Sequence, residues 1–355
     1  MRVEGYFIPA IGGVSVTSVA LCSLFSLLYL ALCDAPAHAQ SPVVLVGSGS
    51  SVPTRLYTRW TQEYDKRTPG IQMRYVAFGT TEGIATAAHG GSDFAAGEIL
   101  LSGKEQADLK LVELPVALIG IVVIYNLPSL HQELRLSGEA LAGIFLGDVN
   151  TWNAPQIAKF NPNLDLPNTP IRVVNRAAGK GTNYVFTDFL SNANSKFRAQ
   201  IGVTRSPKWP VGTSVGSSSD MADKVKNYPG SIGYVELQYA LQDGIPQAAV
   251  LNSSGKFLKA SQHSITAACE AAESPYWNNF FASLVAKPGV DSYPITSFTW
   301  IYLRTKSTNN ARATALADFV GWIYADGQQF AREEGYSSLP SPLLSALVKT
   351  AKTLR

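Results

Sequence analysis

Apolar strand-like runs and helix-like runs alternate along most of the chain. Ser41 to Val46 is a short apolar run. Leu56, Trp60 and Tyr64 follow it, four residues apart from one another. That spacing places three large side chains on one face of a helix. The pattern returns at Met73 to Phe78, which is strand-like and precedes a run of small residues with helical character. Alternation of this kind predicts an α/β fold.

Two apolar runs predict buried strands far apart in the sequence. Leu114 to Asn126 is almost continuously apolar and too short to span a bilayer, and Phe298 to Leu303 is the second run. Strands near residues 115–125 and 292–303 would cross twice between two lobes with a cleft and a hinge. The predicted bounds are residues 40–118 and 296–355 for the first lobe and residues 119–295 for the second.

The first 39 residues have a different pattern. Val14 to Leu32 is almost wholly apolar, and Ala37-His38-Ala39 follows it. These features are typical of a secretory signal, residues 1–39, cleaved after Ala39. A retained membrane anchor is the alternative, because the apolar stretch is close to the ~20 residues that span a bilayer. Cys22 and Cys33 both follow a leucine, which disfavours lipid attachment at either cysteine.

Composition and charge fit an exported globular protein. Of the 355 residues 46% are hydrophobic and 15% are charged, which indicates a large core. The net charge is +3, and removal of Arg2, Glu4 and Asp34 with the signal raises it to +4. So small a charge gives no reason to expect a nucleic-acid partner. Cys269 would be the only cysteine of the mature chain, so no internal disulfide is expected.

Four loops offer hydroxyls, amides or charges near the ends of predicted strands. They are Gly47 to Ser51, Gly79 to Gly83, Asp93 to Glu98 and Asn175 to Asn183. Open α/β sheets bind ligands at the carboxyl ends of their strands, and helix starts attract anions because their first amides are unpaired. Each loop alone is more often a plain helix cap. Together they predict one ligand site assembled from several loop tips.

No pattern of residues indicates a catalytic, metal or cofactor site. His89, His131 and His263 lie far apart, and neither H-x-x-x-H nor C-x-x-C occurs. Gly179 to Thr182 lacks the spacing of a nucleotide P-loop, which needs Ser or Thr directly after the lysine. Gly47 to Ser51 does not match the G-x-S-x-G of a nucleophile elbow. We therefore expect a binding protein and not an enzyme.

Several segments carry a resemblance to a known family. They are Gly47 to Tyr57, Pro115 to Pro128, Gly143 to Gly147 with Trp152, Arg176-Ala177 with Gly179, Gly181 and Thr182, Lys208-Trp209-Pro210, Pro229 to Glu236, and Pro294 to Ser297. On these residues the mature chain resembles PstS, the family of periplasmic phosphate-binding proteins of the phosphate ABC transporter. The resemblance implies a two-lobed fold of the type II periplasmic-binding-protein class that closes over a dehydrated phosphate. It also implies export to the periplasm and delivery of phosphate, or a similar oxyanion, to a membrane ABC permease. We expect a monomer.

The resemblance also implies which residues bind the anion. Carried over by position, the donors of the family fall on Ser51 (hydroxyl), Val52 (backbone amide), Thr80 (in place of a serine), Arg176, Gly181 and Thr182. One guanidinium with amides and hydroxyls is a donor set that satisfies a buried oxyanion.

Three positions depart from the pattern of the family. Glu98 stands where the family has an aspartate that accepts the proton of phosphate, and Lys180 replaces a serine donor. Ala178 replaces an aspartate that holds the arginine. The formal charge of the site changes from −1 for Arg, Asp and Asp to +1 for Arg176, Lys180 and Glu98, which should alter ligand choice or protonation. Alternatively, Glu98 and Lys180 pair with each other, leaving phosphate binding weaker or another anion preferred.

Two rival functions stay open beside phosphate capture for a permease. Secreted relatives of this family have been associated with phosphatase activity, which would make the protein an enzyme. A protein that has lost transport would instead act as an anion sensor or scaffold. The missing nucleophile, base and metal cluster argue against the first rival, and nothing in the sequence decides against the second.

Overall fold

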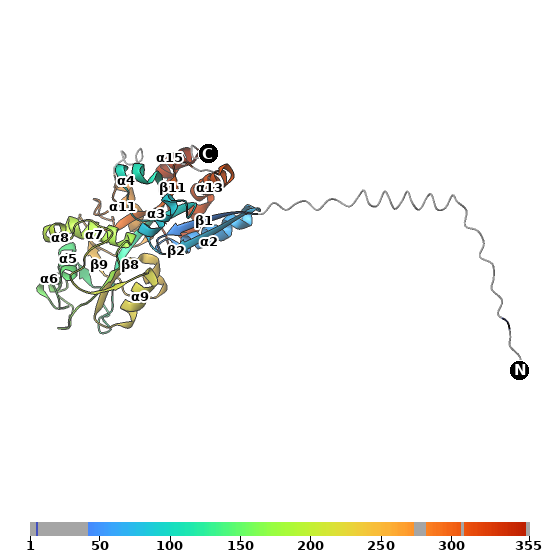
Figure 1. The fold of residues 1–355 in the computed structure, drawn as a ribbon. Coiled ribbons are helices and arrows are strands. Elements are labelled where there is room, and N and C mark those ends of the chain that lie inside the picture. The colour runs from blue at the N-terminus through green and yellow to red at the C-terminus, as the bar shows by residue number, and fades with distance from the viewer. Residues whose placement is uncertain (1–4, 6–41, 273–281, 307–308, 353–355) are drawn as a thin grey trace. The chain divides into compact units, whose positions relative to one another are not determined.

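A computed structural model describes residue 5 and residues 42–272, 282–306 and 309–352. Pro42–Arg355 forms one compact unit, and Figure 1 shows its helices and strands. The predicted signal, residues 1–39, lies outside the described residues apart from residue 5. Among the described residues, none of the helices is both long enough and apolar enough to span a membrane.

Eight strands form the main sheet in the order β2-β1-β3-β11-β4-β8-β6-β7. Their bounds are β1 Val43–Gly49, β2 Ile71–Ala77, β3 Phe94–Gly97, β4 Leu111–Tyr125, β6 Arg172–Arg176, β7 Thr213–Val215, β8 Ser231–Glu236 and β11 Thr296–Arg304. Three short strands form a second sheet: β5 Arg135–Leu136, β9 Ala249–Leu251 and β10 Phe257–Leu258. The mixed α/β fold confirms the fold class expected from the sequence.

Helices connect most of these strands. Their bounds are α2 Thr54–Arg67, α3 Thr80–Ala88, α4 Gly103–Leu109, α5 Gly138–Leu146, α6 Pro155–Ala158, α7 Gly181–Ala193, α8 Ser195–Gln200, α9 Ser218–Asn227, α10 Leu237–Gln242, α11 Gln262–Glu270, α13 Asn310–Trp322, the π-helical turn η1 Ile323–Gly327, α14 Gln328–Glu333 and α15 Ser341–Ala351. The labels in Figure 1 follow these elements.

The apolar face predicted for the first helix is the buried face of α2. Trp60 is fully buried, and its indole N–H donates to the carbonyl of Gly327 at 2.7 Å. Tyr64 packs edge-on against Phe319 of α13, with ring centroids 5.1 Å apart. Segments from both ends of the chain therefore build one part of the core together.

Strand β4 is the long buried strand predicted near residues 114–126. Every residue of β4 except Val112 is buried. Its first part pairs antiparallel with β11, from Leu111 to Gly120, and its last part pairs antiparallel with β8, from Ile121 to Tyr125. One strand thus joins two groups of strands in a single sheet. The lobe bounds at residues 118 and 296 stay a prediction, because Pro42–Arg355 forms one compact unit.

Glu113, on β4, leads to a prediction about stability and pH. The side chain is fully buried, and Leu101 N–H donates to its carboxylate at 3.1 Å. Burial raises the pKa of Glu113 to about 8 from an ordinary value of 4.5. Between these two pH values the folded state binds more protons than the unfolded state, so the free energy of unfolding falls as pH rises.

Glu113→Gln should remove much of that fall, so that the variant is a few kcal/mol more stable than the parent at pH 8 but not at pH 4.5. Urea denaturation at both pH values measures the effect. Glu270→Gln, an exposed change, should leave the pH slope as it is. An unchanged slope in Glu113→Gln would show that this carboxyl is ionised when folded.

Candidate functional site

Three of the four predicted loops meet around one buried arginine, and the fourth contributes its final residue. The hydroxyl of Ser51, after β1, lies 3.0 Å from that of Ser218, at the start of α9. The backbone N–H of Gly181, the first residue of α7, donates to Thr80 Oγ1 at 3.1 Å. These contacts join residues far apart in the sequence that follow the carboxyl ends of β1, β2, β6 and β7, where open α/β sheets bind ligands.

Arg176 ends β6 and is buried, with a relative exposure of 2%. One terminal nitrogen donates to Ser218 Oγ at 3.1 Å, and the other donates to Ser51 Oγ at 3.2 Å and to the carbonyl of Gly216 at 3.4 Å. Its Nε–H is buried and has no hydrogen-bond partner among the described residues. The guanidinium is therefore held by neutral groups and keeps an unused donor.

Glu98 follows β3 and is almost completely buried. Its carboxyl accepts hydrogen bonds from Ser50 Oγ at 2.8 Å, from Thr299 Oγ1 at 3.3 Å and from Thr80 Oγ1 at 3.4 Å. Burial raises the pKa of Glu98 to about 8, although the Ser50 and Thr299 hydroxyls and the charge of Arg176 oppose the shift. A carboxyl with that pKa is mostly protonated at pH 7, so it can donate a hydrogen bond to an anion instead of repelling it.

Two further predicted ligands lie at buried positions. The hydroxyl of Thr182, the second residue of α7, is fully buried and has no partner among the described residues. The N–H of Val52 donates to Ser50 Oγ at 3.1 Å and is also buried. The first turn of α7 thus presents a buried hydroxyl without a partner at the positive end of a helix dipole.

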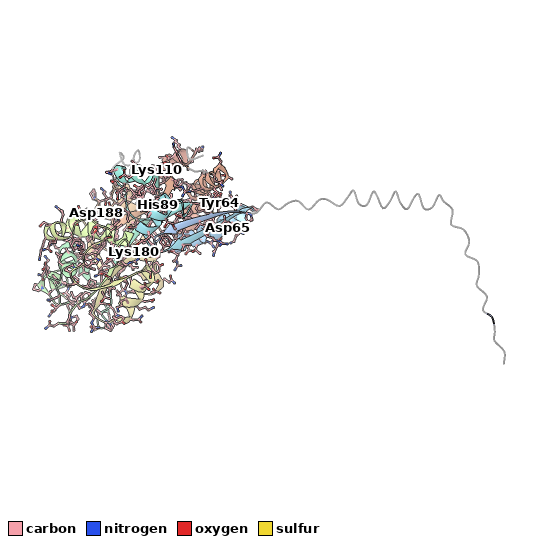
Figure 2. All side chains as sticks on the ribbon, viewed as in Figure 1. Tyr64, Asp65, His89, Lys110, Lys180 and Asp188 are labelled. Carbon is pink, nitrogen blue, oxygen red and sulfur yellow. The ribbon has the colours of Figure 1, made fainter. Side chains whose placement is uncertain are left out.

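Lys180 lies differently from Arg176. Its ammonium donates to the carbonyl of Phe78 at 2.8 Å in an exposed hydrogen bond. Figure 2 labels Lys180 on the ribbon. The alternative in which Lys180 pairs with Glu98 is not observed. The formal count of +1 therefore includes one charge that does not contact the buried carboxyl.

Several residues that the sequence did not indicate shape the site. Tyr234, on β8, accepts a hydrogen bond from Arg176 N–H at 3.1 Å and donates to Asn183 Oδ1 at 2.5 Å. Asn183 in turn donates to the carbonyl of Ala177 at 2.7 Å, which closes the loop between β6 and α7. Ser217 caps α9, and its neighbour Ser218 contacts Arg176. Only the fold could show that contact.

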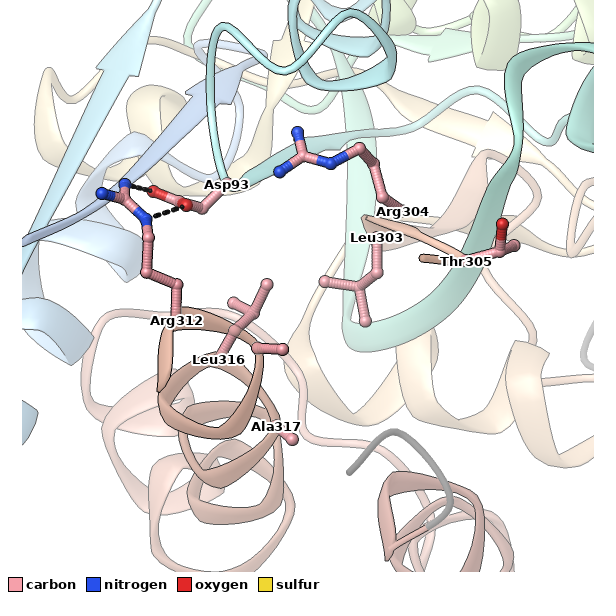
Figure 3. A pocket seen from close by; sticks show the side chains of 8 residues that line it. Asp93, Leu303, Arg304, Thr305, Arg312, Leu316 and Ala317 are labelled. Atoms are coloured by element: carbon pink, nitrogen blue, oxygen red, sulfur yellow. Dashed lines mark hydrogen bonds and ion pairs between the residues drawn. The ribbon is translucent and has the colours of Figure 1, made fainter. Parts of the chain in front are cut away.

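Asp93, at the start of the third predicted loop, lies in a different pocket. Its carboxylate binds Arg312 through two hydrogen bonds of 2.8 and 2.6 Å (Figure 3). Arg304 lines the same pocket and donates to the carbonyls of Ala87 and Ser92. Because carboxylate or carbonyl oxygens already occupy both guanidinium groups, this pocket offers an anion little. Only Glu98, at the far end of the loop, reaches the candidate site.

Metal ligands do not gather in the described part of the chain. Residues 42–272, 282–306 and 309–352 contain no group of three or more His, Cys, Asp or Glu side chains that could hold a metal ion. The donors around Arg176 are hydroxyls and amides, which suit an oxyanion better than a cation. The fold and this candidate site are together typical of α/β solute-binding proteins.

Comparisons with known proteins agree with this class of protein. Residues 36–326 match the family described as PBP superfamily domain. The phosphate-binding protein PstS of Xylella fastidiosa (strain 9a5c) is 32% identical over 312 residues, which are 88% of this chain and 85% of that protein. The one from Haemophilus influenzae is 32% identical, over 87% of this chain and 92% of that protein. The chain belongs to the PstS family.

A solved structure supports the fold. It is a putative phosphate ABC transporter substrate-binding protein from Clostridium perfringens with bound phosphate. The match has a TM-score of 0.60 at 17% sequence identity and covers 84% of this chain and all of that one. At that identity the likeness concerns the fold alone.

Proposed function

We propose that this protein captures inorganic phosphate, or a closely related oxyanion, around Arg176 and delivers it to a membrane ABC permease. The observation that carries the proposal is the buried guanidinium of Arg176, which ends β6 and, among the described residues, donates only to Ser51, Ser218 and Gly216. Membership of the PstS family and the names of its relatives support phosphate as the anion. Those relatives are named as binding proteins, in agreement with an assignment as a non-enzyme.

The unused donors explain why an anion would bind. Arg176 Nε–H and the Thr182 hydroxyl are buried without partners among the described residues, and a buried donor left unpaired costs about 1–3 kcal/mol. An oxyanion with several acceptor oxygens would satisfy both donors at once. Ser51, Thr80, Val52 and the N–H of Gly181 would exchange present hydrogen bonds for bonds to the anion. Lys180 would act from the exposed side and attract the anion.

Export and partners follow from the same assignment. We propose that residues 1–39 direct the chain to the periplasm and are removed there, and that the mature protein works as a monomer. Mass spectrometry of the protein recovered from the periplasm tests the removal of residues 1–39. An N terminus at Gln40 is expected, and a full-length chain in the membrane fraction would contradict it.

A calorimetric titration tests the proposed ligand. Residues 40–355 should bind phosphate saturably, with sulfate, arsenate and phosphonates as the comparison set. If phosphate gives no heat at millimolar concentration and another anion of the set binds, that anion is the ligand in place of phosphate. Absence of heat with every anion would contradict the proposed function.

Thr182→Val should separate binding from stability. The change removes a hydroxyl that has no partner in the described structure, so the free energy of unfolding should stay the same or rise. Phosphate affinity should fall about tenfold or more, because a hydrogen bond to a charged group contributes about 1.5–3 kcal/mol. Calorimetry and urea denaturation measure the two quantities.

Thr187→Val is the matched control in the same helix. Its buried hydroxyl donates to the carbonyl of Thr204 and accepts from the N–H of Thr204, both at 3.0 Å. This variant should lose stability and keep its phosphate affinity. Equal affinities in Thr182→Val and the parent would remove Thr182 from the site.

A further inference from the structure

Glu236 is a second buried carboxyl beside Arg176. It is the last residue of β8 and is fully buried. Strand β8 runs parallel to β6, with Ile232 opposite Val173, so Glu236 and Arg176 end neighbouring strands at the same edge of the sheet. Neither carboxyl oxygen has a hydrogen-bond partner among the residues that the structure describes. A buried carboxyl without partners is costly, and natural proteins keep few of them.

Four groups from different parts of the fold interact with Glu236 through its charge. They are Arg176 at the end of β6, Glu98 after β3, Tyr239 on α10 and Tyr336 after α14. Burial raises the pKa of Glu236, and the charge of Arg176 opposes that rise. Glu236 in turn raises the pKa of Glu98. The three charged groups of the site are therefore coupled.

Glu236 acts on Arg176 by charge and not by holding it. Both terminal nitrogens of Arg176 donate to Ser218, Ser51 and Gly216, and no hydrogen bond or ion pair joins them to Glu236 among the described residues. A bound anion would meet the same guanidinium from the side of the loops. Glu236 and the anion would then share one positive charge in a buried site of low dielectric constant, where repulsion between them is strong.

We propose that Glu236 determines specificity: it is the buried counter-charge of Arg176, competes with the anion for that charge, and limits how negative an anion the site accepts. The proposal rests on the proposed function and adds to it a residue and a rule of selection. With Lys180 on the exposed side, the buried charges are Arg176, Glu98 and Glu236. These sum to −1 when both carboxyls are ionised and to +1 when both are protonated.

Sulfate and phosphate should respond differently to this charge. Hydrogen phosphate can donate its proton to a carboxylate of the site, whereas sulfate has no proton to donate and meets the full repulsion. Glu236→Gln keeps the size of the side chain and removes its charge. At pH 8 we expect the affinity for sulfate to rise about tenfold or more and that for phosphate to rise less.

The experiment has one arm with anions and one without. Calorimetry gives the affinities of the parent and of Glu236→Gln for sulfate and phosphate, with Glu113→Gln as a control that removes a buried carboxyl elsewhere and should change neither. Carbon-13 NMR of the glutamate carboxyls, without anion, gives the pKa of Glu236 in the parent and in Arg176→Gln. That pKa should rise when Arg176 loses its charge, while the pKa of Glu113 stays the same.

Unchanged or weaker sulfate binding in Glu236→Gln would overturn the proposal. So would a pKa of Glu236 that does not move in Arg176→Gln, a measurement that stands even if Glu236→Gln does not fold. A third outcome separates the two proposals. If the parent gives no heat with phosphate, but Glu236→Gln binds sulfate more tightly than the parent does, the role of Glu236 holds and the assignment of phosphate fails.

Discussion

Arg176→Ala should weaken phosphate binding about 10³-fold. The side chain carries a buried positive charge, and its removal leaves the anion beside Glu98 and Glu236 without a compensating charge. Removing one partner of a buried charge pair costs about 3–5 kcal/mol, which corresponds to roughly a hundredfold to several thousandfold in affinity. Arg176→Lys should bind with intermediate affinity, because lysine keeps the charge and loses the planar fork that bonds Ser51 and Ser218.

Arg172→Ala is the matched control on the same strand. Arg172 is the first residue of β6 and is exposed, whereas Arg176 is the last residue and is buried. Calorimetric affinity should be unchanged in Arg172→Ala, and circular dichroism should show that all three variants are folded. If Arg176→Ala bound phosphate within about threefold of the parent, less than 1 kcal/mol, the anion would lie elsewhere.

Gly181→Ala should reduce phosphate affinity about 10²-fold. A Cβ at this position would lie 2.3 Å from Glu98 Oε2 and 2.8 Å from Thr80 Oγ1, closer than atoms without a bond between them can approach. Glu98 and Thr80 would both have to move, and both are predicted to contact the anion. Displacement of buried side chains costs about 1–3 kcal/mol, and the loss of aligned donors adds to that cost.

Gly103→Ala provides the comparison for Gly181→Ala. Gly103 is likewise the first residue of its helix, and a Cβ there meets nothing within 4 Å. Alanine at that position should leave affinity unchanged and stability equal or slightly higher. Equal affinities for Gly181→Ala and the parent, measured by calorimetry, would mean that the first turn of α7 does not face the anion.

Local signals were enough to predict strands β1, β2, β4 and β11, the apolar face of helix α2 and three of the four loops. Ser51, Thr80 and Gly181 lie at strand-to-helix turns, and a turn of that kind can be recognised from its immediate neighbours in the sequence. The apolar run of β4 and the apolar residues four positions apart in α2 are also signals that lie within one short segment. These are properties that hydrophobic periodicity and turn residues determine directly.

Contacts between distant residues were beyond the reach of the same signals. Ser218 contacts Arg176, and Glu236 ends the strand next to that of Arg176, although no local pattern in the sequence indicates either relation. Asp93 reads as a member of the site and instead pairs with Arg312, 219 residues away in the chain. Lys180 was counted as a charge of the buried site, but its ammonium contacts the carbonyl of Phe78. Strand order and side-chain direction decide each of these outcomes.

A crystal structure of residues 40–355 grown with phosphate is the most direct test of anion binding at Arg176. We expect an anion in contact with the Arg176 guanidinium, the Thr182 hydroxyl and the first amides of α7, with Lys180 at its exposed side. A phosphate bound at another place, with Arg176 still joined to Ser51 and Ser218, would contradict it.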